Sequence, residues 1–122
     1  FGMTEKDRGL LIQIGNKMRE IDEDVWLNFL LRRIQELGAS RIVIPDVRFF
    51  NEYKVLSDLA WTIRISASTQ ARASREGYDP EFDNDPTEVG LLEAPTDYVI
   101  HNECCLQCLY EAVDVLMEGV LA

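Results

Sequence analysis

Two short apolar runs constrain the fold of this chain most strongly. Residues 41–45 (RIVIP) and 61–65 (WTIRI) are rich in β-branched side chains, and a stretch of helix length at 50–59 separates them. An apolar run this short is typical of a strand that is covered on both faces of a parallel sheet. Two such strands with a helix between them form a β-α-β unit. The sequence therefore predicts an α/β fold with a parallel sheet.

Further elements are expected on both sides of this unit. Residues 5–19 carry an apolar helical stripe behind Thr4 as an N-cap, and a second helix begins behind Asp22 and stops at Gly38. Residues 97–101 predict a third strand, and the stripe from 106 to 120 predicts a closing helix. The order is typical of a three-layer αβα protein with a short parallel sheet, with Trp26 and Trp61 in its core.

Length and charge exclude several classes. A chain of 122 residues is the size of one domain. Its net charge of -10, from 22 acidic and 12 basic residues, argues against binding a nucleic acid. No apolar run approaches the ~18 residues that cross a membrane, and no secretory signal is visible, so a cytoplasmic protein is expected.

Polar side chains gather where two of the predicted strands end. They are Asp46, Arg48, Asn51 and Glu52 after the first strand, and Asn102 and Glu103 after the third. The carboxyl ends of parallel strands form the ligand crevice in such sheets. An Asp in this place could hold Mg²⁺, directly or through water, and Arg48 could bind a phosphate. Asn51 and Glu52 could contact a base or a sugar.

The polar segment that follows residue 65 carries two arginines three residues apart, Arg72 and Arg75. If this segment is helical at its start, the two share a face and could close over a transferring phosphoryl group. A simpler interpretation stays open for all of these residues. An Asp behind a strand is often a turn residue, and arginines often form exposed ion pairs or a solvated face.

The three cysteines lie together in the stretch HNECCLQCL. Cys105 and Cys108 have the two-residue spacing of a metal-binding or redox pair, but no second pair completes four ligands. Reduced thiols at the start of a helix are the simpler interpretation, and His101 is expected to be a strand-end residue.

Three motifs occur in order along the chain: DRGLLIQIGNKMREIDEDVW, IVIPDVRFFNE and TEVGLLEAPTDYVIHN. Together they resemble the C-terminal two-thirds of bacteriophage-type deoxynucleoside monophosphate kinases, which are P-loop kinases. The resemblance covers nearly the whole chain. Animal-type phosphomevalonate kinase is a more distant relative with similar elements.

The resemblance implies transfer of the γ-phosphoryl group of Mg-ATP to a deoxynucleoside monophosphate. Residues 1–38 would be the acceptor-side helices, and residues 66–88 the lid. The implied acceptor and crevice residues are Arg8, Gln13, Arg19, Asp46, Arg48, Asn51, Glu52 and Glu88. Arg72 and Arg75 would be lid arginines, and Asn102 would open the loop that passes the adenine of ATP.

Two departures from the family pattern matter. Residues 85–88 read DPTE where the family usually has His-x-Ser-Glu. The histidine is lost and a hydroxyl is kept, so the family's acceptor specificity does not carry over to this chain. No GxxxxGK[ST] occurs, so the phosphate-cradling loop and its lysine are missing. In the family, the strand that leads to this loop lies between the strands at 41–46 and 61–65. Without that strand, the backbone groups along the facing edges of its two neighbours would be unpaired.

The expectation is therefore an incomplete nucleotide-kinase-like domain that is inactive alone. The first residue, Phe1 rather than Met, favours a truncated product. A missing N-terminal segment or a homodimer partner would complete the sheet. Two alternatives stay open: a non-catalytic module that binds a nucleotide or a protein, and a kinase of another small phosphate ester, as in phosphomevalonate kinase.

Overall fold

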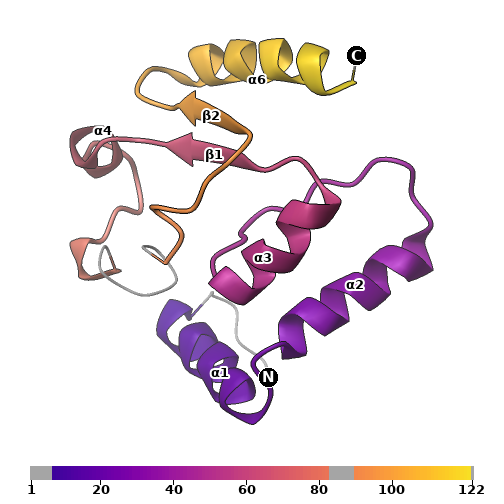
Figure 1. Cartoon of the computed structure of the whole chain (residues 1–122). Helices are drawn as coiled ribbons and strands as arrows, with labels where there is room; N and C mark the ends of the chain where they lie inside the picture. The colour runs from indigo at the N-terminus through magenta and orange to yellow at the C-terminus, as the bar shows by residue number, and fades with distance from the viewer. Residues whose placement is uncertain (1–6, 83–89, 122) are drawn as a thin grey trace. The chain divides into compact units, whose positions relative to one another are not determined.

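The computed structural model describes residues 7–82 and 90–121, in which three helices precede the first of two short strands (Figure 1). The elements are α1 (Arg8–Ile21), α2 (Val25–Leu37), α3 (Phe50–Leu59), β1 (Ile63–Ser66), α4 (Thr69–Ala73), the 3₁₀ turn η1 (Pro80–Phe82), β2 (Tyr98–His101) and α6 (Leu106–Leu121). They group into two compact units, Phe1–Val47 and Arg48–Ala122. Helices with a parallel sheet confirm the predicted α/β class. None of the described helices has the length and hydrophobicity needed to cross a membrane.

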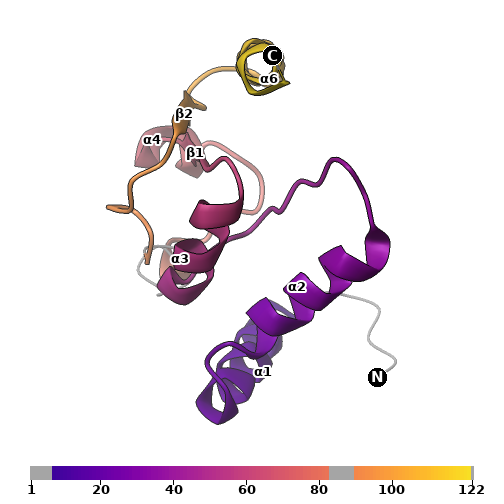
Figure 2. The ribbon, with the colours of Figure 1, turned by 45° about the vertical axis from the view of Figure 1, so that its right-hand side comes forward.

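The first unit contains α1 and α2, joined by a short connection (Figure 2). Asp7 caps α1, because its carboxylate accepts a hydrogen bond of 2.9 Å from the backbone N–H of Leu10. The expected cap, Thr4, lies outside the described residues. The indole Nε1 of Trp26 donates to the carbonyl of Gly15 at 3.4 Å and so links the two helices. Trp26 is still 37% exposed, so its predicted place in the core is wrong.

The end of α2 is where the sequence predicts it. Gly38 has a φ of 57°, and its N–H donates to the carbonyl of Ile34 at 3.3 Å. Glycine adopts this left-handed conformation without the steric penalty of a side chain, which explains why the helix ends here. Leu27 is the buried residue of α2, with 4% of its surface exposed.

The predicted strand at 41–45 is wrong. Residues 42–48 are irregular, and the described sheet contains only β1 and β2 (Figure 1). The side chain of Val43 is 86% exposed, although its type suggested burial between two layers. A β-branched run becomes a strand only when a neighbour satisfies its backbone groups, and Pro45 has no N–H to offer one. The β-α-β unit therefore lacks its first strand.

The second unit is built around two parallel strands. Ile63 lies opposite Tyr98, and the register continues to the pair of Ser66 and His101. At the amino ends, the Asp97 carboxylate accepts from the backbone N–H of Thr62 at 2.8 Å and from its hydroxyl at 2.9 Å. These bonds fix the register at the point where both strands begin.

Side-chain packing around the strands is sparse. Ile100 of β2 is buried, with 6% exposed, and α6 runs beside this strand and contacts it (Figure 1). Arg64 donates from Nη2 to the carbonyl of Leu91 at 2.7 Å and also to that of Ala94, which holds the turn before β2 against β1. The rings of Trp61 and Tyr98 meet in a tilted arrangement with their centroids 5.8 Å apart, but 60% of Trp61 is exposed, so this tryptophan is not a core residue either.

Candidate functional site

The carboxyl ends of β1 and β2 lie side by side because the strands are parallel. Ser66 ends β1, His101 ends β2, and the two are register partners. The backbone N–H of Asn102 donates to the carbonyl of Ser66 at 2.6 Å, so the pairing continues one residue beyond β2. The segments that leave the two strands therefore start from the same edge, where α/β proteins bind their ligands.

A carboxylate joins these two segments. Glu103 accepts a hydrogen bond from the backbone N–H of Ser68 at Oε1 and another from its hydroxyl at Oε2, both at 2.7 Å. Ser68 is also the N-cap of α4, since its Oγ accepts from the N–H of Ala71 at 3.1 Å. The hydroxyl and the N–H of Ser68 hold the pKa of Glu103 below its ordinary value, and Arg75 and His101 act in the same direction.

Two arginines lie on the segment that leaves β1. Arg75 donates from Nη2 to the backbone carbonyl of Asn102 at 2.7 Å, and Arg72 donates from Nη2 to the hydroxyl of Thr69 at 3.2 Å. Arg75 is exposed and Arg72 is half-buried. The structure therefore joins Arg75, predicted as a lid arginine, to Asn102, predicted at the end of the third strand. We call Ser68, Arg72, Arg75, Asn102 and Glu103 the edge cluster.

Three of the other predicted residues lie at the start of α3. Glu52 accepts at Oε2 from the backbone N–H groups of Arg48, at 3.2 Å, and Phe49, at 3.3 Å. Its carboxylate thus closes the first turn of the helix, as acidic residues at this position commonly do. Asn51 lies beside it in the same turn.

The remaining predicted residues belong to other parts of the chain. Arg8, Gln13 and Arg19 are in α1, and Asp46 has a left-handed backbone with a φ of 61°. All four belong to the first unit, whereas the edge cluster comes entirely from the second. Glu88 lies outside the described residues.

Sequence reasoning missed Ser68, which joins both segments of the edge cluster. A signal existed, because Ser68 follows a predicted strand and precedes a helix-compatible stretch, as an N-cap residue does. Arg64 carried no such signal. Its bonds to the carbonyls of residues 91 and 94 depend on how a turn far along the chain is folded.

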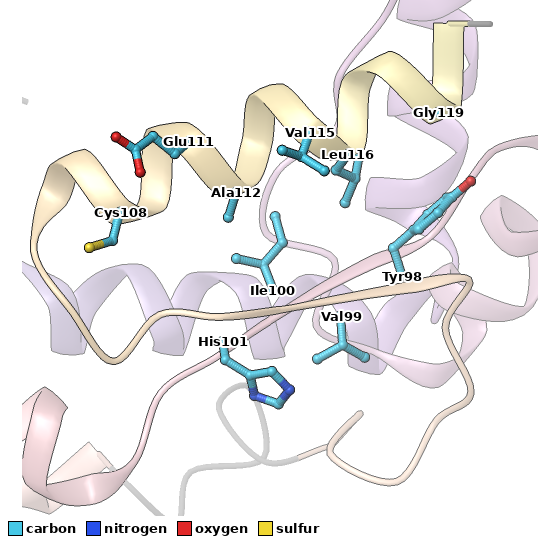
Figure 3. A pocket seen from close by; sticks show the side chains of 10 residues that line it. All are labelled: Tyr98, Val99, Ile100, His101, Cys108, Glu111, Ala112, Val115, Leu116 and Gly119. Carbon is cyan, nitrogen blue, oxygen red and sulfur yellow. The ribbon is translucent and has the colours of Figure 1, made fainter.

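A separate groove of about 630 Å³ lies between β2 and α6 (Figure 3). Ile100 points from the strand toward Ala112, Val115 and Leu116 of the helix, while His101 points to the opposite side of the strand (Figure 3). The lining of the groove is mainly apolar, so the groove offers few groups to orient a charged ligand. The edge cluster, with two guanidinium groups, is the better candidate for binding an anion.

The three cysteines gather at the start of α6. All are free thiols at the surface, and their sulfur atoms lie within 4.8 Å of one another. Within the described residues no His, Asp or Glu joins this group, so the fourth ligand of a closed tetrahedral zinc site is absent.

Comparisons of the chain with protein-family models, with curated proteins and with solved structures find no match.

Proposed function

We propose that the edge cluster binds the phosphates of a nucleotide, as the lid and adenine-side part of a nucleoside monophosphate kinase. One observation carries this proposal: the arginine-bearing segment after β1 folds back onto the residues that follow β2. The bond from Arg75 to the carbonyl of Asn102 and the two bonds from Ser68 to Glu103 define that fold-back.

The chemistry of the edge cluster supports an anionic ligand. Arginine presents a planar fork of donors that matches a phosphate, and a site with two such groups attracts anions whatever the net charge of the chain. Glu103 is already committed to the two donors of Ser68, so its negative charge is stabilised within the cluster. The guanidinium groups remain the cluster's positive charges.

The topology supports the same proposal. A parallel pair of strands with a lid-like segment between them is expected of the second half of a P-loop kinase sheet. The register of β1 and β2 and the motifs IVIPDVRFFNE and TEVGLLEAPTDYVIHN agree with that arrangement. In this proposal Arg72 and Arg75 neutralise the transferring phosphoryl group, and Asn102 lies beside the adenine.

The resemblance to the kinases assigns roles to further residues, each within its own unit. In the second unit Arg48 would bind phosphate, and Asn51 and Glu52 would contact the nucleoside. In the first unit Arg8, Gln13 and Arg19 would bind an acceptor phosphate. Asp46 fits a magnesium ion by its donor chemistry, because Mg²⁺ is commonly held by one or two carboxylates together with substrate phosphates. The ion would screen the phosphate charges of ATP.

The 122 residues contain no phosphate-cradling loop, so binding without turnover is expected of this chain. Phosphoryl transfer would require that loop from a further segment or a partner. The same feature favours a second candidate function, a non-catalytic module that holds a nucleotide at the edge cluster.

Calorimetric titration with Mg-ATP and with each deoxynucleoside monophosphate tests the proposal. The variant Arg75→Glu reverses one charge in the edge cluster, and Lys54→Glu makes the same change of charge at an exposed site on α3. We expect Arg75→Glu to weaken binding about tenfold or more, and Lys54→Glu to leave it nearly unchanged. Equal affinities for both variants would place the nucleotide elsewhere. A coupled assay for ADP, run with a P-loop segment added, separates the two candidate functions: ADP release supports the kinase, and binding without ADP release supports the non-catalytic module.

A further inference from the structure

The three cysteines directly follow Glu103 of the edge cluster in the chain, and two of them are arranged as a reactive pair. Cys105 directly precedes α6, and Cys108 lies in the first turn of that helix. Their sulfur atoms are 3.4 Å apart, which is contact distance for two thiols. Both are exposed, so a small reagent in solution can reach them.

The position of Cys105 favours its thiolate. The unpaired N–H groups and the dipole at a helix N-terminus stabilise negative charge on a side chain placed there. A hydrogen bond from the backbone N–H of Cys108, together with the Cys108 thiol, lowers the pKa of Cys105. The neighbouring thiol of Cys104, followed by that of Cys105, raises the pKa of Cys108 to about 11. The lowered pKa suits Cys105 to the role of the attacking thiolate, and the raised pKa leaves Cys108 as the thiol that attacks second.

The third cysteine is a poorer partner for Cys105. Neighbouring Cα atoms are about 3.8 Å apart, below the range of about 4.4 to 6.8 Å that disulfides usually span. A bond between Cys104 and Cys105 would therefore strain the chain. A spacing of three residues at the start of a helix brings two side chains onto one face without that strain.

We propose that Cys105 and Cys108 form a redox-active dithiol that exchanges with low-molecular-weight disulfides. The Cys105 thiolate attacks one sulfur of such a disulfide, and the first thiolate of the reagent leaves. Cys108 then gives its proton to the thiolate that was released first and attacks the sulfur of Cys105, which releases the second thiolate. One bond forms between Cys105 and Cys108, the reagent's S–S bond breaks, and two electrons pass from the protein to the reagent.

The experiment uses the reduced chain, a chelator to exclude metal ions, and oxidised glutathione as the probe. Remaining thiols are alkylated after a short incubation, and peptide mapping by mass spectrometry locates each bond. We expect two of the three thiols to be lost together, with a Cys105–Cys108 cross-link and no retained glutathione. Three independent mixed disulfides, or a cross-link that includes Cys104, would overturn the proposal.

Serine variants assign the roles. Cys108→Ser should trap glutathione on Cys105, and Cys105→Ser should slow the loss of thiols, while Cys104→Ser should leave the cross-link intact. Far-ultraviolet circular dichroism checks that each variant keeps its helices. If the cross-link disappears in Cys104→Ser while the helices persist, Cys104 takes part in the disulfide and the proposed Cys105–Cys108 pair is wrong.

Discussion

The carboxylate of Glu103 accepts two hydrogen bonds from Ser68, one from the backbone N–H and one from the hydroxyl, each at 2.7 Å. Ser68 begins α4 and Glu103 follows β2, so this one carboxylate joins segments 35 residues apart in the chain. Through this contact the residues after β2 lie beside the helix that carries Arg72.

Removing the Glu103 carboxylate should loosen the start of α4. In Glu103→Ala the N–H of Ser68 loses its acceptor, so its hydrogen exchange measured by NMR should become faster. Glu118→Ala, which removes an exposed carboxylate near the end of α6, is the matched control and should leave this exchange rate unchanged. An unaltered rate in Glu103→Ala would mean that the contact does not hold α4 in place.

The opposite end of the sheet should respond to acid. The N–H of Thr62, followed by its hydroxyl, holds the pKa of Asp97 below its ordinary value. A carboxyl group whose pKa is depressed by folding stabilises the protein above its unfolded pKa of about 4. That contribution is lost as the pH falls through the lower, folded pKa.

An NMR titration of the Asp97 carboxyl carbon checks this direction. Thr62→Val removes the hydroxyl donor but keeps the N–H, so the pKa of Asp97 should rise part of the way toward its ordinary value. Thr62→Ser keeps both donors and should leave the pKa low. A value in Thr62→Val equal to that of the unchanged chain would contradict a role for the hydroxyl.

Ile100 should contribute most of the stability that β2 supplies. It is 6% exposed and faces α6, whereas its neighbour Val99 is 49% exposed (Figure 3). Ile100→Ala should lower the free energy of unfolding by about 2 kcal/mol, because it removes apolar groups that are buried in the folded chain. Val99→Ala should cost much less. Urea unfolding of both variants measures the difference, and equal losses would show that Ile100 is not packed against the helix.

Two glycines should respond in opposite directions to alanine. Gly38 has a φ of 57°, and a Cβ there would meet nothing within 4 Å, so only backbone strain opposes the change. Gly38→Ala should destabilise the chain by about 1 to 2 kcal/mol. Gly119 lies within α6 and also has open space around it. Gly119→Ala should stabilise by up to about 1 kcal/mol. Thermal unfolding that moves in one direction for both variants would contradict this.

Local patterns predicted where the helices lie, but the predicted start of α2 behind Asp22 is wrong, because Asp22 is the C-cap of α1 and α2 begins behind Asp24. The stretch 50–59 is α3, and the stripe behind residue 105 is α6. Both follow from apolar spacing and end signals that lie within the segment itself. Gly38 marked the end of α2 for the same reason.

The strand at 41–45 could not be predicted in this way, because pairing depends on a neighbour that the segment does not contain. In the candidate site too, some residues could be predicted from local sequence and others could not. Asn102 was predicted at a strand end and Arg75 on the polar segment after residue 65, and the structure joins them by a hydrogen bond. Ser68 and Arg64 make contacts over 27 to 35 residues, and only the folded chain brings those partners together.

The most direct test of the central claim is an NMR titration of the isotope-labelled chain with Mg-ATP. We predict that the largest amide shifts occur at Ser68, Arg75, Asn102 and Glu103. In Arg75→Glu these shifts should reach half-saturation at an Mg-ATP concentration about tenfold higher or more, whereas Lys54→Glu should leave that concentration nearly unchanged. Shifts confined to the groove between β2 and α6, or no saturable shifts at all, would contradict nucleotide binding at the edge cluster.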